Sequence, residues 1–170
     1  MRNYEERAKS WLNVAYQYGK SKSGCAKVQV GATITSKYLS EPLVFGSNRT
    51  YPVDCTEKGC RRQELYGEDS KNHRLPSDCR AIHAEIDCIT ELTRRLVQGI
   101  DIGSFSLPCT IVVTRYPCEA CARAIANCRF IDTVVYGGEQ EISEETREIF
   151  KSTNIEVIHI DWKPEYDTDR

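Results

Sequence analysis

The sequence predicts a three-layer α/β/α fold built around a five-stranded mixed sheet. The first observation is a helical pattern followed by two short apolar segments, which indicate a helix and a β-hairpin. The second is the alternation of strand and helix patterns with short links through the C-terminal half. Because strand–helix–strand units place successive strands in parallel with right-handed crossovers, we expect one mixed sheet with helices on both faces.

The N-terminal half should begin with a helix over residues 3–18. Its larger apolar residues have the three-four spacing of an amphipathic helix: Tyr4, Ala8, Trp11, Leu12, Ala15 and Tyr18. Residues 28–35 alternate apolar and polar side chains, which predicts a strand with one buried face. A turn at residues 40–42 leads to a short strand at 43–45, and the two strands should form the hairpin.

The C-terminal half should continue with a helix over residues 81–98, where an apolar stripe ends just before Gly99. The elements expected after it are a buried strand at 109–114, a helix at 118–127, a strand at 133–136, a helix at 143–151 and a strand at 155–160. We expect a single domain over residues 1–170, with a frayed polar tail at 161–170.

Residues 51–79 are predicted to be a polar, cysteine-containing insertion without usable periodicity. It is too long for a simple connector in a compact domain, so it should be functional or held by a ligand. One hypothesis is a second, structural zinc bound by the bracketing thiols Cys55, Cys60 and Cys79, with Cys25 or His73 as the fourth ligand. The alternative is unbound thiols near the core.

The composition favours a small-molecule substrate in a reducing compartment. A net charge of -2 and a pI near 6.0 provide no field that would attract RNA or DNA. The chain has nine cysteines and no apolar N-terminal segment typical of a signal peptide or membrane span. We therefore expect a cytoplasmic protein that binds neither nucleic acid nor membrane, with cysteines as metal ligands or core residues.

Two short motifs supply the parts of a catalytic zinc site. They are His83-Ala84-Glu85 and Pro117-Cys118-Glu119-Ala120-Cys121. Zinc catalysis needs three protein ligands, an open fourth position and a carboxylate that moves protons without binding the metal. We expect His83, Cys118 and Cys121 as the ligands and Glu85 as the proton shuttle. The alternative is a structural zinc with four closed ligands, or simply buried cysteines.

The spacing within the motifs suits helix ends. Cysteines three apart lie on one face of a helix, and Pro117 is suited to the first helical turn. The positive end of the helix dipole would stabilise both thiolates. His83 and Glu85 can both reach the metal only if their helix is aimed at it end-on. We therefore expect two helix N-termini that face each other across the zinc.

These motifs resemble those of the cytidine and deoxycytidylate deaminase superfamily, whose signature is H-x-E followed by P-C-x-x-C. The similarity is greatest to zinc-dependent deoxycytidylate (dCMP) deaminases of microbial or phage type, and it runs from about residue 25 to 160. Besides the metal motifs it rests on Val30-Gly31-Ala32, on Cys55-Thr56-Glu57-Lys58-Gly59-Cys60 and on Cys79-Arg80 before the histidine.

The resemblance implies a cytidine-deaminase-like fold and hydrolysis of dCMP to dUMP and ammonia, a step of pyrimidine deoxynucleotide metabolism. It also implies a homo-oligomer, with a hexamer as one form, and dCTP and dTTP as allosteric effectors. Two departures bear on these implications. The family commonly has Gly-Tyr-Asn-Gly where this chain has Gly46-Ser47-Asn48-Arg49, and Asp87 replaces a usual Asn. Regulation is therefore expected to differ, and so is part of the pocket or its support.

Candidate substrate contacts lie on both sides of the metal motifs. Asn48 and Arg49 could hold a sugar hydroxyl and a phosphate, or belong to an ordinary polar loop. By resemblance, the backbone amide of Ala84 holds the ring carbonyl and Tyr116 packs against the base, unless Tyr116 is a core aromatic. Arg115 is a candidate phosphate contact, unless it is merely solvated.

Three other interpretations remain open. A nucleoside cytidine deaminase would usually carry Cys where His83 stands and would need no phosphate contact. A cytosine- or adenine-type deaminase of nucleic acid would be expected to have a basic channel and stacking aromatics, which the net charge does not suggest. A non-catalytic, zinc-stabilised binding module would close the fourth metal position and would not need Glu85.

Overall fold

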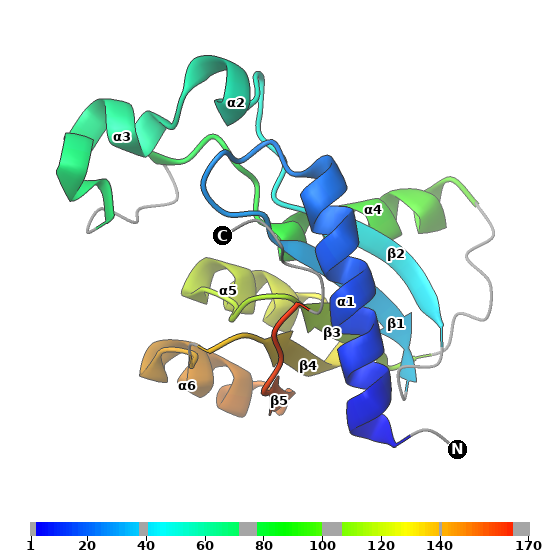
Figure 1. The fold of residues 1–170 in the computed structure, drawn as a ribbon. Coiled ribbons are helices and arrows are strands. Elements are labelled where there is room, and N and C mark those ends of the chain that lie inside the picture. Colours follow the sequence, from blue (N-terminus) through cyan, green and yellow to red (C-terminus); the bar gives the residue numbers. More distant parts are fainter. Residues whose placement is uncertain (1–2, 38–40, 72–77, 100–106, 140, 165–170) are drawn as a thin grey trace.

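The computed structural model describes residues 3–37, 41–71, 78–99, 107–139 and 141–164. It contains the expected five-stranded mixed sheet, with strand order β2-β1-β3-β4-β5 (Figure 1). The strands are β1 (Gly31–Ser36), β2 (Pro42–Ser47), β3 (Cys109–Val113), β4 (Ile131–Gly137) and β5 (Glu156–Ile160). β1 pairs antiparallel with β2 and β3, whereas β3, β4 and β5 run parallel. The predicted hairpin and the predicted parallel half are both confirmed.

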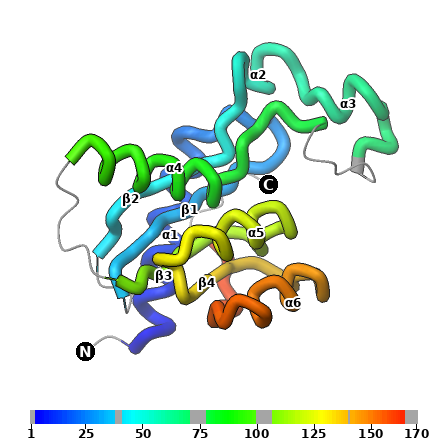
Figure 2. The backbone as a smooth tube through the Cα atoms, turned by 180° about the vertical axis from the view of Figure 1, so that it is seen from behind, coloured from blue at the N-terminus to red at the C-terminus, as the bar shows by residue number. Residues whose placement is uncertain are grey.

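Helices cover both faces of this sheet. They are α1 (Tyr4–Lys22), α2 (Cys55–Lys58), α3 (Arg61–Tyr66), the 3-10 helix η2 (Gly67–Lys71), α4 (Ala84–Val97), α5 (Glu119–Asn127) and α6 (Glu144–Ser152). α1 lies on one face, and Figure 2 shows α4, α5 and α6 on the other. The alternation of strand side chains separates the two cores, since Val112 of β3 packs towards α1 while Ile111 and Val113 pack towards α4 and α5.

β1 is buried on both faces, so the expectation of one exposed face is wrong. The strand lies between β2 and β3 rather than at an edge, and α1 and α4 cover its two sides. Its polar residues are therefore paired inside the protein: the Thr33 hydroxyl donates to the Val44 carbonyl at 2.8 Å. A buried threonine whose hydroxyl is bonded fits the sheet interior at little cost.

The insertion contains short helices that its sequence pattern did not predict. α2, α3 and η2 project beyond the end of the sheet, on the side where α4 and α5 begin (Figures 1 and 2). Helices of four to six residues are too short for apolar periodicity to show. An ion pair between Arg80 and Glu64 (2.9 Å) and a hydrogen bond from Tyr66 to Asp78 (2.9 Å) tie α3 to the segment that leads into α4.

The start of the C-terminal tail is packed, contrary to the expectation of fraying. Trp162 is only 7% exposed, and its indole nitrogen donates to Asn13 of α1 at 2.9 Å. Residues 165–170 of the expected tail lie outside the described residues. Within the described ranges, no helix combines the length and the apolar character needed to cross a membrane.

Candidate active site

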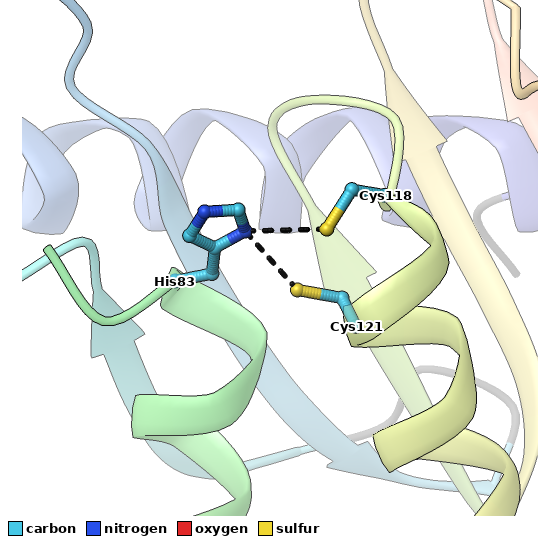
Figure 3. Close-up of side chains that lie close together, drawn as sticks. All are labelled: His83, Cys118 and Cys121. Carbon is cyan, nitrogen blue, oxygen red and sulfur yellow. Dashed lines mark hydrogen bonds between the residues drawn. The ribbon is translucent and has the colours of Figure 1, made fainter. Parts of the chain in front are cut away.

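Three side chains from two helix N-termini converge on one point. His83 is the N-cap of α4, Cys118 is the N-cap of α5, and Cys121 lies in the first turn of α5. The Nδ1 atom of His83 is 3.4 Å from the Cys118 sulfur and 3.3 Å from the Cys121 sulfur (Figure 3). All three donor atoms lie within 4.8 Å of one another.

This donor set fits a zinc ion. One imidazole nitrogen and two thiol sulfurs are typical zinc ligands, and a tetrahedral ion about 2.0–2.3 Å from each would hold adjacent donors roughly 3.5 Å apart. The measured separations of 3.3 and 3.4 Å agree with that requirement. Within the part of the chain that the structure describes, no other group of three or more His, Cys, Asp or Glu residues converges in this way.

The two thiols already differ in their affinity for a proton. The pKa of Cys118 is lowered to about 3, chiefly because Cys121 donates a hydrogen bond to it, with a further contribution from His83. The same hydrogen bond and burial raise the pKa of Cys121. Because cysteine binds zinc as the thiolate, a zinc ion bound here would displace the proton of Cys121.

Glu85 is buried beside these ligands without belonging to them. It lies in the first turn of α4, two residues after His83, and is 4% exposed. Burial raises the pKa of its carboxyl above the ordinary value, while the charge of His83 acts in the opposite direction. A carboxyl with a raised pKa next to a site for an activated water is suited to accept and return protons.

The ligands open onto a cavity of about 320 Å³. Asn48, Ala84, Arg115 and Tyr116, four of the five predicted substrate contacts, line it together with His83, Glu85 and Cys118. Asn48 is engaged with the backbone: its amide oxygen accepts from Val30 N–H at 2.8 Å and its amide nitrogen donates to the Val28 carbonyl at 2.7 Å. It therefore fixes the cavity wall.

Arg49, the fifth predicted contact, does not line the cavity. Its guanidinium pairs with Asp87 at 3.1 Å and donates to the Tyr18 hydroxyl at 3.0 Å. These partners turn the side chain towards α1 and α4, so the structure lends no support to a phosphate contact by Arg49. The Arg115 guanidinium stacks 5.4 Å from the ring centre of Tyr116 at the cavity wall.

The cysteines of the insertion approach one another without forming a closed set. Cys25, Cys60 and Cys79 line the same cavity as the zinc ligands. The pKa of Cys55 is raised by burial first and then by the charges of these three thiols, which places all four near one another. Among the described residues, however, no three of their sulfurs lie within 4.8 Å of one another. His73 lies outside the described residues, and a second zinc stays a prediction.

Three polar or charged residues of the cavity were not predicted from the sequence: Lys27, Arg62 and Ser70. The Lys27 ammonium donates to the Ser70 hydroxyl at 3.3 Å, which joins the segment before β1 to the insertion. Arg62 comes from α3 and its charge acts on His83 across the cavity. The sequence signal that pointed to Arg62 and Ser70 was the expectation that so long an insertion would be functional, and no signal pointed to Lys27.

Comparison with known protein families agrees with the zinc site that the geometry indicates. A sequence model described as "Cytidine and deoxycytidylate deaminase zinc-binding region" matches residues 5–138, which include both metal motifs. The chain belongs to this family. The zinc-binding deaminase domain and the cluster of His83, Cys118 and Cys121 together fit a catalytic zinc. A search of curated protein sequences found no significant match.

Solved structures with this deaminase fold differ in what they bind. The dCMP deaminase from the cyanophage S-TIM5, in complex with dCMP and dUMP, is 20% identical, with a TM-score of 0.65 over 94% of this chain and 99% of that chain. A diaminohydroxyphosphoribosylaminopyrimidine deaminase/reductase from Thermotoga maritima is 19% identical (TM-score 0.56, 92% of this chain and 37% of that chain). NE0047, in complex with 2,6-diaminopurine, is 16% identical (TM-score 0.54, 94% and 75%). At such identities the similarity establishes the fold alone.

Proposed function

We propose that this chain is a zinc-dependent hydrolase that converts dCMP to dUMP and ammonia. The observation that carries the proposal is the convergence of His83, Cys118 and Cys121 at two helix N-termini, with the buried Glu85 beside them on one cavity. When bound to these three residues, zinc would act as a Lewis acid and lower the pKa of water to about 7.

Glu85 carries the proton transfers in the proposed reaction. Its carboxylate accepts a proton from the attacking water and delivers it to N3 of the pyrimidine, while the water oxygen bonds to C4. A second transfer through Glu85 moves the remaining hydroxyl proton to the amino group. The C4–N bond then breaks, ammonia leaves, and C4 keeps a carbonyl oxygen. A positioned acid–base group of this kind typically contributes about 10² to 10⁴ in rate.

The base is held by the first turn of α4 and by the loop before α5. Ala84 is the first residue of α4, so its N–H has no acceptor within the helix and is available to the ring carbonyl. Ala84 lines the cavity and is fully buried. Tyr116 precedes the Pro-Cys motif and lines the same cavity, where its ring would pack on the base.

The choice of dCMP rests on three points. The motifs resemble those of dCMP deaminases, a solved structure with this fold binds dCMP, and the cavity carries several cationic side chains. The second candidate is deamination of another phosphorylated heterocycle, which is favoured by the similarity to the Thermotoga maritima enzyme.

The test is ammonia release from dCMP, deoxycytidine, CMP, dCTP and 5-methyl-dCMP, each with and without a metal chelator. We expect release from dCMP to exceed that from the others and to stop with the chelator. Release from deoxycytidine at an equal rate would favour a nucleoside deaminase. No release from any substrate by zinc-loaded protein would favour the non-catalytic module.

We also propose that the chain forms one domain and that a second zinc pins the insertion through Cys55, Cys60 and Cys79, with Cys25 or His73 as the fourth ligand. Binding would have to draw these sulfurs to about 3.8 Å, the spacing of a tetrathiolate site. Elemental analysis of active protein tests this: two zinc ions per chain are expected, and one would exclude the second site.

Cytoplasmic location, homo-oligomer formation and regulation by dCTP and dTTP remain predictions from composition and resemblance.

A further inference from the structure

We infer that Lys27, Ser70 and Arg62 form the phosphate-binding wall of the cavity, so that the insertion makes the site specific for a phosphorylated substrate. The inference rests on the proposed deamination, since it concerns the same cavity. It assigns a function to residues 51–79 that neither the metal motifs nor the fold requires.

The first support is the charge of the cavity lining. Three cationic side chains, Lys27, Arg62 and Arg115, line it, and Glu85 is the one carboxylate among the lining residues that the structure describes. A neutral nucleoside has no anionic group that could pair with these cationic side chains, whereas a monophosphate dianion does.

The second support is the partner of Lys27. Its ammonium donates to the Ser70 hydroxyl at 3.3 Å and makes no ion pair with a carboxylate in the described part of the chain. Ser70 is only 8% exposed, so its hydroxyl is held in place by the insertion. An ammonium and a hydroxyl held side by side can both donate to one phosphate.

The third support is the orientation of α3. Its residues Arg61, Gln63, Glu64 and Leu65 are exposed, whereas Arg62 is partly buried and lines the cavity. His83 and Glu85 line the same cavity. The Arg62 side chain is therefore within reach of a ligand that occupies the cavity, and its planar guanidinium suits a phosphate.

The dimensions agree with a mononucleotide. A cavity of about 320 Å³ is at the small end of ligand pockets, which are typically about 300–1,000 Å³. The ligands of the zinc and Glu85 come from α4 and α5, while Ser70 and Arg62 come from the insertion. A base beside Glu85 and a phosphate against the insertion would therefore span the cavity.

The experiment compares Arg62→Gln and Lys27→Met with Arg61→Gln, a matched control on the exposed side of α3. Steady-state kinetics are measured with dCMP and deoxycytidine, and calorimetry measures the affinity for the products dUMP and deoxyuridine. We expect Arg62→Gln and Lys27→Met each to raise KM for dCMP and Kd for dUMP about tenfold or more, the usual effect of losing a charged hydrogen bond. In these two variants KM for deoxycytidine and Kd for deoxyuridine should stay within about twofold of the wild-type values. In Arg61→Gln every KM and Kd should do so.

If Arg62→Gln and Lys27→Met weakened the binding of dUMP and deoxyuridine equally, the inference would be overturned, because the two side chains would then support the structure and not the phosphate. Wild-type protein that binds dUMP no more tightly than deoxyuridine would also overturn it, even if deamination proceeds. The wild-type protein could bind dUMP more tightly than deoxyuridine through these two residues and yet release no ammonia. That result would support the phosphate-binding wall and contradict the proposed deamination.

Discussion

Glu85 and Asp87 lie two residues apart on α4 and have different surroundings. Glu85 is buried next to the zinc ligands. Asp87 accepts from the Ser47 N–H at 3.0 Å and pairs with Arg49 at 3.1 Å. It thereby fastens the loop that carries Asn48 to the helix that carries His83. Of the two expectations for Asp87, a change in the pocket or in its support, these contacts agree with the second.

Replacing Glu85 by Gln should retain zinc and lower turnover of dCMP by at least about 10², because the amide cannot accept the proton of the attacking water. Zinc content and kcat are measured on the same preparation. Near-normal turnover at full zinc content would rule out the proposed role of Glu85, and loss of zinc would show that the side chain supports the metal.

Replacing Asp87 by Asn and by Ala should have unequal effects on stability. The Asp87→Asn variant would retain an oxygen for the Ser47 N–H and lose only a partly exposed ion pair, so the free energy of unfolding should fall by less than about 1 kcal/mol. The Asp87→Ala variant would leave a partly buried N–H unpaired and should cost about 1–3 kcal/mol. Urea unfolding distinguishes the two, and equal losses would show that the Ser47 contact contributes nothing.

At the scale of elements, the site depends on how closely α4 approaches β2. A Cβ atom placed on Gly46 would lie 2.4 Å from the Ala84 carbonyl oxygen and 2.5 Å from the Cys88 nitrogen. Only glycine allows the strand to come this close to the first turns of α4. That contact sets the position of the helix end that carries His83 and Glu85.

Replacing Gly46 by Ala should therefore push α4 away from the sheet. We expect a loss of about 1–3 kcal/mol in the free energy of unfolding, as for overpacking of a core, together with weaker zinc binding. Val97→Ala is the control on the same helix, because Val97 is 83% exposed and should change stability by no more than about 0.5 kcal/mol. Unchanged zinc affinity in Gly46→Ala would show that the helix end tolerates the shift.

At the scale of the whole molecule, the metal site joins segments that are far apart in the chain. His83 follows the hairpin and the insertion, whereas Cys118 and Cys121 follow β3, the central strand at which antiparallel pairing changes to parallel. A ligand that binds only the folded chain stabilises it by mass action, so zinc should hold α4 and α5 together.

Removing zinc with a chelator should lower Tm. Free zinc at about 100 times its Kd contributes roughly 2.7 kcal/mol, which is about 5–10 °C for a chain of this size. Scanning fluorimetry of wild-type protein and of His83→Ala, with and without chelator, measures this. Without chelator the variant should melt below the wild type, and the chelator should lower its Tm by less than it lowers that of the wild type. An unchanged wild-type Tm would contradict zinc binding by the folded chain.

The elements that were predicted correctly from the sequence have strong local patterns. The stripe of α4, the apolar run of β3 and the strand–helix alternation after it depend on neighbouring residues, and their ends were placed within a few residues. The short helices of the insertion were missed, because four to six residues cannot show a helical period. The two-sided burial of β1 was missed because it depends on which strands and helices lie beside it.

The sequence by itself determined the chemistry of the metal site and the family, because H-x-E and P-C-x-x-C bring together donors of known type at spacings that local helix geometry controls. Only the tertiary structure decided which distant side chains share the cavity. It turned Arg49 towards Asp87 and brought Arg62 and Ser70 of the insertion to the zinc ligands. These placements arise from the packing of segments far apart in sequence, which no local spacing encodes.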